Sequence, residues 1–434
     1  MKILLLTPGT GNFHCGSCLH DEALLRGLRR LGHDAAIHAL YLPLVLDDRE
    51  GIDGDAVSMG GIGLYLQAKS ALLRQLPAAA LRWLDRPGLL RRAANRADMT
   101  SPSELGRMTE EMLLGANGKT RVEVARLVEH LEREGRPDVV LLNNALLLGL
   151  AEPIARALDC PVVCTLQGED TFIDSLPDPW RSNTWQLLAD KAKDTALFLP
   201  VSAHHSAIMG ERMGLAPDRM RIVYNGIEAA HYPPQTEAPD PPVIGYLARL
   251  CAAKGLDTLV DAYIEMQRRS PESTAELHLI GAATPNDLRF VEAQRVKLRR
   301  EGLIDRVTIR TNVTLEEKTE ALRGMSVLSV PAMYGESFGL YVLEANAVGV
   351  PAVEPNHAGL AEVIRQTGGG ILYEPGERHF TALAEALTSL LGDAAERRRL
   401  GEAGRAVVLD RFTAERMARD VAQALESACP AFTA

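Results

Sequence analysis

Residues 326–351 read SVLSVPAMYGESFGLYVLEANAVGVP. An apolar run at the start of this stretch ends at a proline, and a loop containing two glycines separates it from a second, longer apolar run. Short apolar runs bounded by glycine or proline are typical of strands buried in a parallel sheet, and a longer run between two of them is typical of a crossover helix. The stretch therefore predicts a strand at 326–330, a helix at 339–348 and a further strand at 351–354.

The same alternation of short strands and amphipathic helices continues on both sides of this stretch. In the C-terminal half we expect further strands at 243–248, 276–280 and 307–310, and helices at 256–269, 287–301, 315–323 and 359–366. In the N-terminal half we expect strands at 2–7, 34–39, 138–142, 161–166, 197–201 and 221–223. A strand followed by a helix and a second strand implies parallel pairing, with helices on both faces of the sheet. The pattern therefore predicts an α/β protein with two Rossmann-like, doubly wound parallel-sheet domains facing a cleft.

The length of the chain supports this division. A single core rarely grows beyond about 250–300 residues, and the chain has 434. A proline-rich segment at 231–242 predicts a linker between a first domain at 1–230 and a second at 243–412. Residues 50–118 interrupt the alternation and are expected to be an insertion in the first domain. Residues 413–434 contain a last helix with no strand after it, which is free to cross back to the first domain.

Composition excludes several classes of protein. Hydrophobic residues make up 46% and charged residues 24% of the chain, which is ordinary for a globular protein. The net charge of −10 argues against general nucleic-acid binding, because that affinity comes mostly from neutralising phosphates. The first apolar run is too short for a signal peptide, no stretch approaches the ~18–20 apolar residues of a membrane span, and the six cysteines are scattered. A cytoplasmic protein with reduced thiols is therefore expected.

A basic segment at 69–96 has two interpretations. It holds seven lysines and arginines against one aspartate, Asp85, with leucines and a tryptophan between them. It could form helices that pack on the first domain with their cations outward. It could instead contact an anionic membrane peripherally and present a lipid acceptor.

Two loops that follow predicted strands carry the chemistry expected of a site for a phosphorylated ligand. Arg249 and Lys254 lie on the loop after the strand at 243–248, where two cations suit a diphosphate. Glu336 lies on the loop after the strand at 326–330, and Glu344 lies inside the following helix. Carboxylates are suited to binding the hydroxyls of ribose or of a sugar. The amides at the start of that helix suit an anion.

These residues resemble the retaining glycosyltransferases of family 4. The likeness rests on Glu336 and Glu344, which seven residues separate in the context ESFGLYVLEANAVGVP, preceded by Arg249-Leu-x3-Lys254-Gly255. It extends to Gly16 with its following helix, to Val201-Ser202 and to Asn225-Gly226-Ile227. The family has the two-domain GT-B fold, so the resemblance implies that fold and transfer of a sugar from a nucleotide-sugar donor with retained configuration. It implies no cofactor and no metal.

The resemblance also implies a role for each matching position. Arg249 and Lys254 would neutralise the diphosphate as negative charge grows on the leaving group. Glu336 would hold hydroxyls of the transferred sugar, and Glu344 the ribose hydroxyls. The implied catalytic residues are thus Arg249, Lys254 and Glu336. The implied donor-binding positions are Glu344 together with Gly16, Arg310, Thr311, Asn312, Val313, Phe338, Gly339 and Leu340.

The chain departs from the family pattern at three places. Cys15-Gly16 stands where two adjacent glycines are common, and Asn346 stands where a small or apolar residue is common. Gln167 occupies the place of a common histidine; a glutamine can hydrogen-bond a sugar hydroxyl but cannot titrate. Gln167 and His14 are the candidates for the acceptor side.

Other functions remain open at this point. The segment HCGSCLH at 14–20 could bind a metal or act in redox chemistry, although its ligands are crowded into seven residues. His204 and His205 are expected to be ordinary residues at the start of a helix. A nucleotide-sugar epimerase of the same fold would need acid–base groups that we do not find. A dinucleotide-dependent oxidoreductase would need a glycine spacing that the first loop lacks.

Overall fold

The structure is a computed structural model that describes residues 1–9, 16–41 and 102–429. The basic segment at 69–96 and most of the expected insertion at 50–118 lie outside the described residues. The chain divides into two compact units, one formed by Met1–Tyr224 and Glu415–Ala434 and the other by Asn225–Ala414. Among the described residues, no helix is both long and apolar enough to span a bilayer.

The first unit is built on a five-stranded parallel sheet with strand order β2-β1-β3-β4-β5. Its strands are β1 (Lys2–Thr7), β2 (Asp34–Ala39), β3 (Val139–Leu142), β4 (Val162–Leu166) and β5 (Leu197–Pro200). Its α-helices are α1 (Gly16–Arg30), α5 (Pro102–Leu114), α6 (Arg121–Glu134), α7 (Ala151–Leu158), α8 (Glu169–Asp174), α9 (Trp180–Lys191), α10 (Ala203–Met213) and α18 (Ala414–Ala428). Its 3₁₀ helices are η3 (Gly115–Asn117), η4 (Ala145–Leu150), η5 (Ala192–Asp194) and η6 (Pro217–Arg219).

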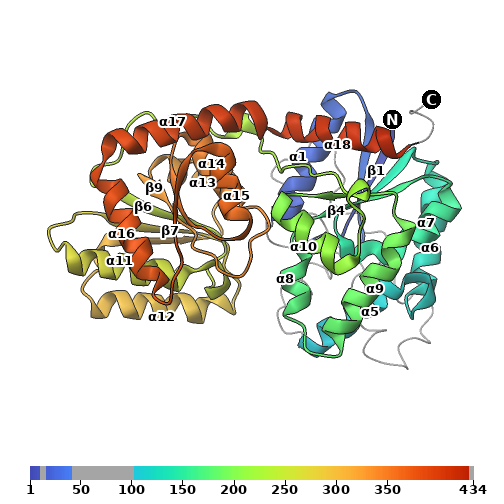
Figure 1. Cartoon of the computed structure of the whole chain (residues 1–434), viewed down its shortest axis with the longest axis horizontal. Coiled ribbons are helices and arrows are strands. Elements are labelled where there is room, and N and C mark those ends of the chain that lie inside the picture. Colours follow the sequence, from blue (N-terminus) through green and yellow to red (C-terminus); the bar gives the residue numbers. More distant parts are fainter. Residues whose placement is uncertain (10–15, 42–101, 430–434) are drawn as a thin grey trace. The chain divides into compact units, whose positions relative to one another are not determined.

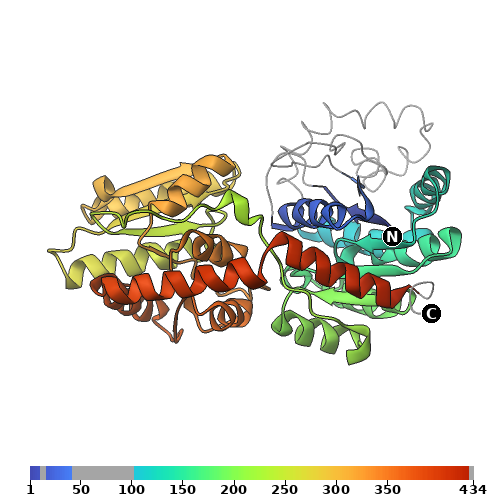
Figure 2. The same cartoon turned by 90° about the horizontal axis from the view of Figure 1, so that it is seen from above.

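Two hydrophobic clusters cover the two faces of this sheet. Alternate residues of β1 point to opposite faces, so Leu4 and Leu6 pack with α6 and α7 while Ile3 and Leu5 pack with α1. The last helix, α18, joins the second cluster and lies beside α1 on the same face of the sheet (Figures 1 and 2). Residues distant in the sequence thus complete the core of the first unit.

The second unit is built on a six-stranded parallel sheet with strand order β11-β10-β9-β6-β7-β8. Its strands are β6 (Val243–Leu247), β7 (Glu276–Gly281), β8 (Val307–Thr311), β9 (Val327–Leu328), β10 (Ala352–Pro355) and β11 (Gly370–Tyr373). Its α-helices are α11 (Leu256–Arg269), α12 (Asp287–Arg300), α13 (Leu315–Arg323), α14 (Leu340–Val348), α15 (Ala358–Thr367), α16 (His379–Gly392) and α17 (Ala394–Arg411). Its 3₁₀ helices are η7 (Ala229–His231), η8 (Ala252–Lys254) and η9 (Ile304–Arg306).

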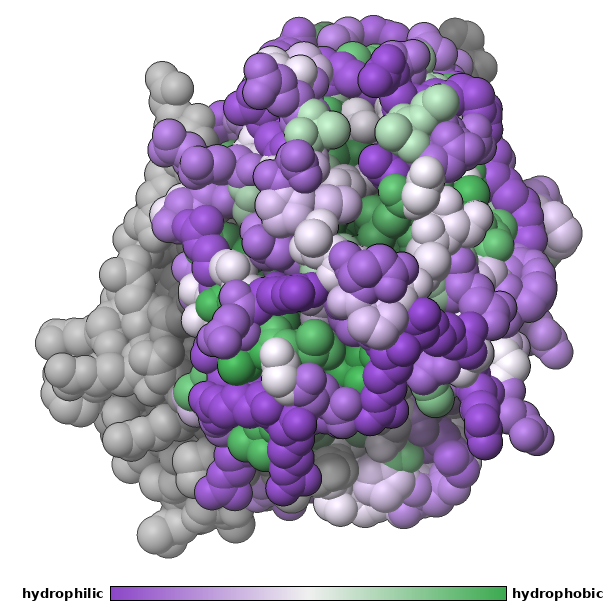
Figure 3. All heavy atoms as spheres, turned by 90° about the vertical axis from the view of Figure 1, so that its left-hand side faces the viewer, coloured by the Kyte–Doolittle hydropathy of each residue, from purple (hydrophilic) through white to green (hydrophobic). Residues whose placement is uncertain are grey.

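The outer surface of the second unit is mainly hydrophilic. In the face shown in Figure 3, hydrophobic residues form small areas separated by hydrophilic ones. Such a surface is ordinary where helices cover both faces of a sheet and turn their polar sides outward.

The predicted fold class is confirmed, since each unit is a parallel α/β sheet covered by helices. Details differ. Residues 221–223 form no strand, although the amides of Arg221 and Val223 donate to carbonyls of β5. The segment at 231–242, expected to be a linker, lies within the second unit. Its Tyr232 is buried, and the amide of Gln235 donates to the carbonyl of Val348 at 2.7 Å. Proline content alone did not reveal these contacts.

Candidate functional site

The strand order of the second unit creates a switch point between β6 and β9. The chain runs from β6 outward through β7 and β8, and then crosses to β9 and continues the other way through β10 and β11. In open α/β sheets, ligands bind beyond the carboxyl ends of the strands at such a point. The two loops that leave it are those predicted to carry the site, one holding Arg249 and Lys254 and the other holding Glu336.

Lys254 and Glu336 form an ion pair at this switch point. The Lys254 ammonium donates to Glu336 Oε2 and also to the hydroxyl of Tyr334, and it lies 4.8 Å from the centre of the Tyr334 ring. The Tyr334 hydroxyl donates to Glu336 Oε2 at 2.7 Å, and the Tyr341 hydroxyl contacts the same oxygen at 3.5 Å. Burial, followed by the charge of Glu336, raises the pKa of both tyrosines, which keeps them as hydrogen-bond donors.

Gly255 allows the two loops to approach each other closely, and Gly339 allows the second loop to pack against α15. Gly255 has a φ of +71°, and a Cβ there would lie 2.2 Å from the carbonyl oxygen of Pro331 on the opposite loop. Gly339 has a φ of +105° directly before α14, and a Cβ there would meet the side chain of Leu360 at 2.6 Å. Both positions require glycine for conformation, and Gly255 requires it for space as well because the opposing atom is a backbone oxygen. The amide of Leu340 then lies in the first turn of α14, where N–H groups lack carbonyl partners within the helix.

Glu344 lies in a second, separate polar cluster. Its Oε1 accepts hydrogen bonds from the Tyr232 hydroxyl at 2.7 Å and from the Lys318 ammonium at 2.9 Å. The side chains of Glu344 and Lys318 are only 11% and 15% exposed. Lys318 and Tyr232 were not identified from the sequence, because they come from α13 and from the proline-rich segment, far from Glu344 along the chain.

Arg249 makes a different set of contacts from Lys254. Its Nε donates to Asp287 Oδ2 at 2.9 Å, and its guanidinium contacts the hydroxyl of Thr284 at 3.3 Å. Burial alone would raise the pKa of Asp287, but hydrogen bonds from Arg249 and Thr284 outweigh it and lower that pKa. The Arg249 side chain is 48% exposed, so it can reach a ligand while Asp287 orients it.

The other predicted residues of the second unit are held by different contacts. Arg310 donates to Glu317 at 2.8 Å, and the side-chain amide of Asn312 exchanges hydrogen bonds with the backbone of Ala283. Thr311 ends β8, so the segment at 310–313 lies at the carboxyl edge of the sheet. Phe338 is buried, with its ring 6.4 Å from that of Phe412.

The departure at Asn346 has a structural explanation. Its side chain is fully buried and donates to the carbonyls of Val350 at 3.1 Å and Gly369 at 2.8 Å. The amide group therefore connects α14 to the segments that lead into β10 and β11.

Glu354 is a buried acid that the sequence patterns did not single out. It is fully buried in β10, and its Oε1 accepts a hydrogen bond from the Val330 amide at 3.0 Å. Its Oε2 has no hydrogen-bond partner among the residues that the structure describes. Burial raises the pKa of Glu354 well above its usual range, and the charge of Glu336 adds to this, against the lowering effect of the Val330 amide. Glu354 thereby supports the start of the loop that carries Glu336. The only feature of the local sequence that pointed to Glu354 was its place at the end of a short apolar run.

Replacing Glu354 with glutamine should make stability less dependent on pH. Between the pKa of an unfolded glutamate, ~4.3, and the raised pKa in the folded protein, the folded state binds more protons, so wild-type stability falls as pH rises. Glutamine keeps an acceptor for the Val330 amide but does not titrate. We therefore expect the E354Q variant to gain stability relative to wild type as pH rises above ~4.3, measured by urea unfolding at about pH 5 and about pH 8. An equal difference at both pH values would contradict the expectation.

In the first unit, Gln167 lies in a polar network at the carboxyl end of β4. Its Nε2 lies 3.3 Å from His20 Nδ1 and 3.1 Å from the carbonyl of Asn143. His20 in turn contacts Asp21 at 3.1 Å, and Asn143 donates to the same carboxylate. A buried histidine thus lies beside the glutamine that replaces the family's common histidine.

His205 was expected to be an ordinary residue at the start of a helix, but that interpretation did not include its burial or its two acidic neighbours. It lies near the start of α10 but is fully buried, with Nε2 3.2 Å from Glu169 and Nδ1 3.5 Å from Asp170. Burial alone would raise the pKa of Glu169, but His205 and backbone amides, including that of Ala145, outweigh it and lower that pKa. Burial raises the pKa of Asp170 despite the nearby imidazole. The sequence did contain a signal for this cluster, because Glu169 and Asp170 follow β4 and His205 follows the neighbouring strand β5.

The other predicted positions of the first unit are only partly described. His14 and Cys15 lie outside the described residues, so the acceptor role of His14 and the metal or redox interpretation of 14–20 stay predictions. Gly16 is the first residue of α1.

Two family models match the chain. The model for group 1 glycosyl transferases matches residues 230–407, and the model for glycosyltransferase family 4 matches residues 110–231. The chain belongs to the family 4 type of glycosyltransferases. The first match covers the part with the Lys254–Glu336 and Glu344–Lys318 pairs, and the second covers the part with Gln167.

Curated relatives of this family member are similar over part of their length. The D-inositol 3-phosphate glycosyltransferase of Nocardia farcinica is 30% identical over 210 residues, 46% of this chain and 46% of the relative. The glycogen synthase of Mycobacterium tuberculosis is 28% identical over 303 residues, 67% of this chain and 69% of the relative. The chain thus spans about half the length of the first of these relatives.

Solved structures show the same fold. Anabaena HepE, crystallised with UDP and glucose, has a TM-score of 0.68 at 17% identity, covering 98% of this chain and 100% of that one. The sucrose-phosphate synthase of Thermosynechococcus elongatus has a TM-score of 0.69 at 18% identity, covering 98% of both chains. At such identities the likeness establishes the GT-B fold of this family member.

Proposed function

We propose that the chain transfers a sugar from a nucleotide-sugar, UDP-linked, to a hydroxyl-bearing acceptor, with retention of the anomeric configuration. The observation that carries the proposal is the Lys254–Glu336 pair at the switch point of the second sheet. The names of the relatives, which include a glycosyltransferase and a synthase of glycogen, support sugar transfer. The presence of UDP and glucose in the crystals of HepE, which has the same fold, supports the choice of donor.

The charges of the site suit departure of a nucleoside diphosphate. When the bond between the anomeric carbon and the diphosphate breaks, negative charge grows on the phosphate oxygens. Lys254 and the partly exposed Arg249 neutralise that charge from positions fixed before the reaction, so that no reorganisation is needed when the bond breaks. The acceptor oxygen bonds to the anomeric carbon on the same face, and its proton passes to the departing phosphate oxygen.

Carboxylates hold the hydroxyls of the donor in this proposal. Glu336 is oriented by Tyr334 and Lys254 and binds hydroxyls of the transferred sugar. Glu344 is oriented by Tyr232 and Lys318 and binds the ribose. Because side-chain cations neutralise the diphosphate, this scheme needs no metal ion at the donor.

The acceptor side is assigned to the first unit. The network of Gln167, His20 and Asp21 offers both donors and acceptors to a sugar or polyol hydroxyl. An acceptor of the small-molecule, glycan or lipid class fits this chemistry. A membrane contact through 69–96 and a cytoplasmic location both stay predictions.

A panel of donors tests the proposal. We expect a UDP-sugar at one hundred times its dissociation constant to stabilise the protein by about 2.7 kcal/mol in a thermal-shift assay, because it binds only the folded state. GDP- and ADP-sugars and NAD⁺ at the same concentrations should stabilise it less. Lack of stabilisation by every nucleotide-sugar would contradict the proposal. Release of UDP that depends on an added acceptor would separate transfer from epimerisation.

A further inference from the structure

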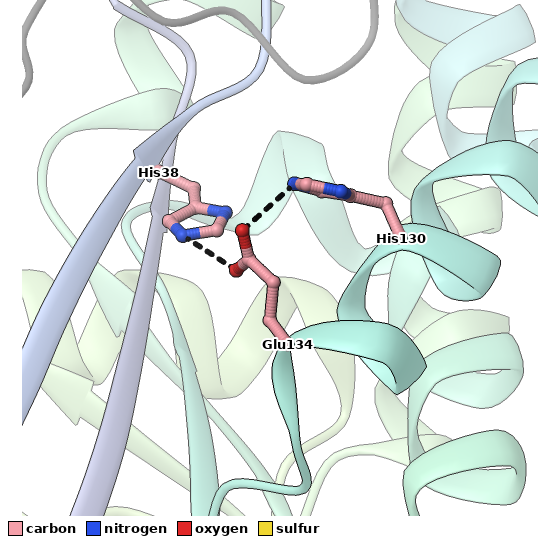
Figure 4. A group of neighbouring side chains, drawn as sticks. All are labelled: His38, His130 and Glu134. Carbon is pink, nitrogen blue, oxygen red and sulfur yellow. Dashed lines mark ion pairs between the residues drawn. The ribbon is translucent and has the colours of Figure 1, made fainter.

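The first unit carries a cluster of two histidines and a glutamate that the candidate site does not include. His38 lies on the edge strand β2, and His130 and Glu134 lie one turn apart at the end of α6 (Figure 4). Alternate residues of β2 point to opposite faces of the sheet. Ala35 and Ile37 belong to the cluster that packs on α1 and α18, whereas His38 points to the opposite face, toward α6. The pleat of the strand therefore brings an imidazole to the last turn of the helix.

The three side chains lie close together, with one histidine against each carboxylate oxygen of Glu134. Glu134 Oε2 lies 3.1 Å from His38 Nε2, and Glu134 Oε1 lies 3.2 Å from His130 Nε2. One ligand atom from each residue lies within 4.8 Å of the others, and the two imidazole rings are 5.8 Å apart between centres. Figure 4 shows the carboxylate between the two rings.

We propose that His38, His130 and Glu134 bind one divalent transition-metal ion of the Zn²⁺ type. Two imidazoles and a carboxylate form a ligand set that zinc prefers. With metal–ligand bonds of about 2.0–2.1 Å, tetrahedral ligands lie roughly 3.3 Å apart. The two observed histidine–glutamate distances are close to that value. The His130 side chain is 45% exposed, so it can turn toward the ion without disturbing the core.

Spacing and surroundings support the same conclusion. His130 and Glu134 are four residues apart and so share one face of α6. A cavity of about 320 Å³ adjoins the cluster and is lined by Lys2, Leu4, Ala36, His38, Leu131 and Glu134. It leaves room for water at a fourth coordination position. The Lys2 ammonium donates to the carbonyls of Glu134 and Gly135, so its charge is held at the end of the helix.

The ion would connect the edge strand to α6 and stabilise the first unit. This role is independent of the proposed donor site in the second unit.

Zinc titration of the chelator-treated full chain tests the proposal. We expect one ion to bind per chain by isothermal titration calorimetry. Zinc at one hundred times its dissociation constant should lower the unfolding equilibrium constant about 100-fold. The H38A, H130A and E134A variants should each weaken zinc binding by at least about 100-fold, because loss of a mere supporting partner of a ligand already costs 10–100-fold.

A matched control is available in the second unit. His278 lies 3.3 Å from Glu276 in a pair of similar exposure, but the described residues include no third ligand in that cluster. The H278A variant should therefore bind zinc as the wild type does. His130 is a safe position to replace because it is half exposed, and unfolding midpoints without zinc would confirm that each variant folds.

The thiols near the N-terminus offer a competing zinc site. If C18S abolished binding while H38A and H130A left it unchanged, the ion would belong to the segment at 14–20 and the proposal would be wrong. Substitution by Co²⁺ separates the two cases in the wild type, since only thiolate ligands give an intense near-ultraviolet charge-transfer band. Absence of that band, with binding that depends on His38 and His130, is the expected result. Failure to bind zinc at all would also overturn the proposal.

Discussion

The K254A variant is expected to transfer sugar about 100- to 1000-fold more slowly than the wild type, the usual effect of removing one group that stabilises charge in a transition state. Lys254 is held at the switch point by Glu336 and Tyr334, so its ammonium lies where a diphosphate is proposed to leave. The alanine variant keeps the loop but loses the charge. The measurement is kcat/KM for the donor identified in the thermal-shift panel.

The control for this variant is another lysine in an ion pair. Lys297 lies 2.8 Å from Asp261 on the outer helices of the second unit, and both side chains are about 40% exposed. We expect K297A to leave kcat/KM unchanged. If K254A and K297A had equal activity, the proposed role of Lys254 would have to be abandoned. Unfolding midpoints of both variants show whether lost activity reflects lost structure.

The second large effect concerns stability. We expect E344A to lower the free energy of unfolding by about 3–5 kcal/mol, because removing one partner of a buried ion pair leaves the other charge uncompensated. Here the Lys318 ammonium would remain largely buried without its carboxylate, and the Tyr232 hydroxyl would lose its acceptor. Urea unfolding of the full chain measures the change. The double variant with K318M should recover part of the loss, since the buried charge is then absent.

An exposed ion pair in the same unit provides the comparison. Arg310 lies 2.8 Å from Glu317, but their side chains are 38% and 44% exposed. The R310A variant should lose no more than about 1 kcal/mol, because solvent screens such pairs. If R310A and E344A lost equal free energies of unfolding, burial would not explain the contribution of the Glu344 cluster to stability. Weaker donor binding by E344A, measured separately, would support its proposed contact with ribose.

Sequence patterns were sufficient to predict the loops that hold Lys254 and Glu336 but not the contacts between them. Lys254 and Glu336 were both predicted as catalytic residues, yet their ion pair joins positions 82 residues apart. The partners of Glu344 show the same limit, since Tyr232 lies 112 residues away in a segment expected to be a linker. A pattern along the chain reports burial and local conformation. It does not report which side chains meet across a sheet.

The burial and the contacts of His205 and Glu354 were the hardest features to predict. His205 has the sequence context of a helix start, and only the neighbouring strand brings Glu169 and Asp170 to its ring. Glu354 follows a short apolar run in the sequence, and only the packing of β10 against the segment after β9 explains a buried acid there.

What the sequence by itself determined was the alternation of strands and helices, the parallel sheets that follow from it, and the charged loops after β6 and β9. These are local properties, because the period of apolar residues and the placement of glycine and proline act within a few residues of the chain. Only the tertiary structure decided which charges form pairs, where α18 packs, and that His38 and His130 meet although 92 positions separate them. Strand order and the pleat of each strand fix those encounters, and both depend on how the whole chain packs.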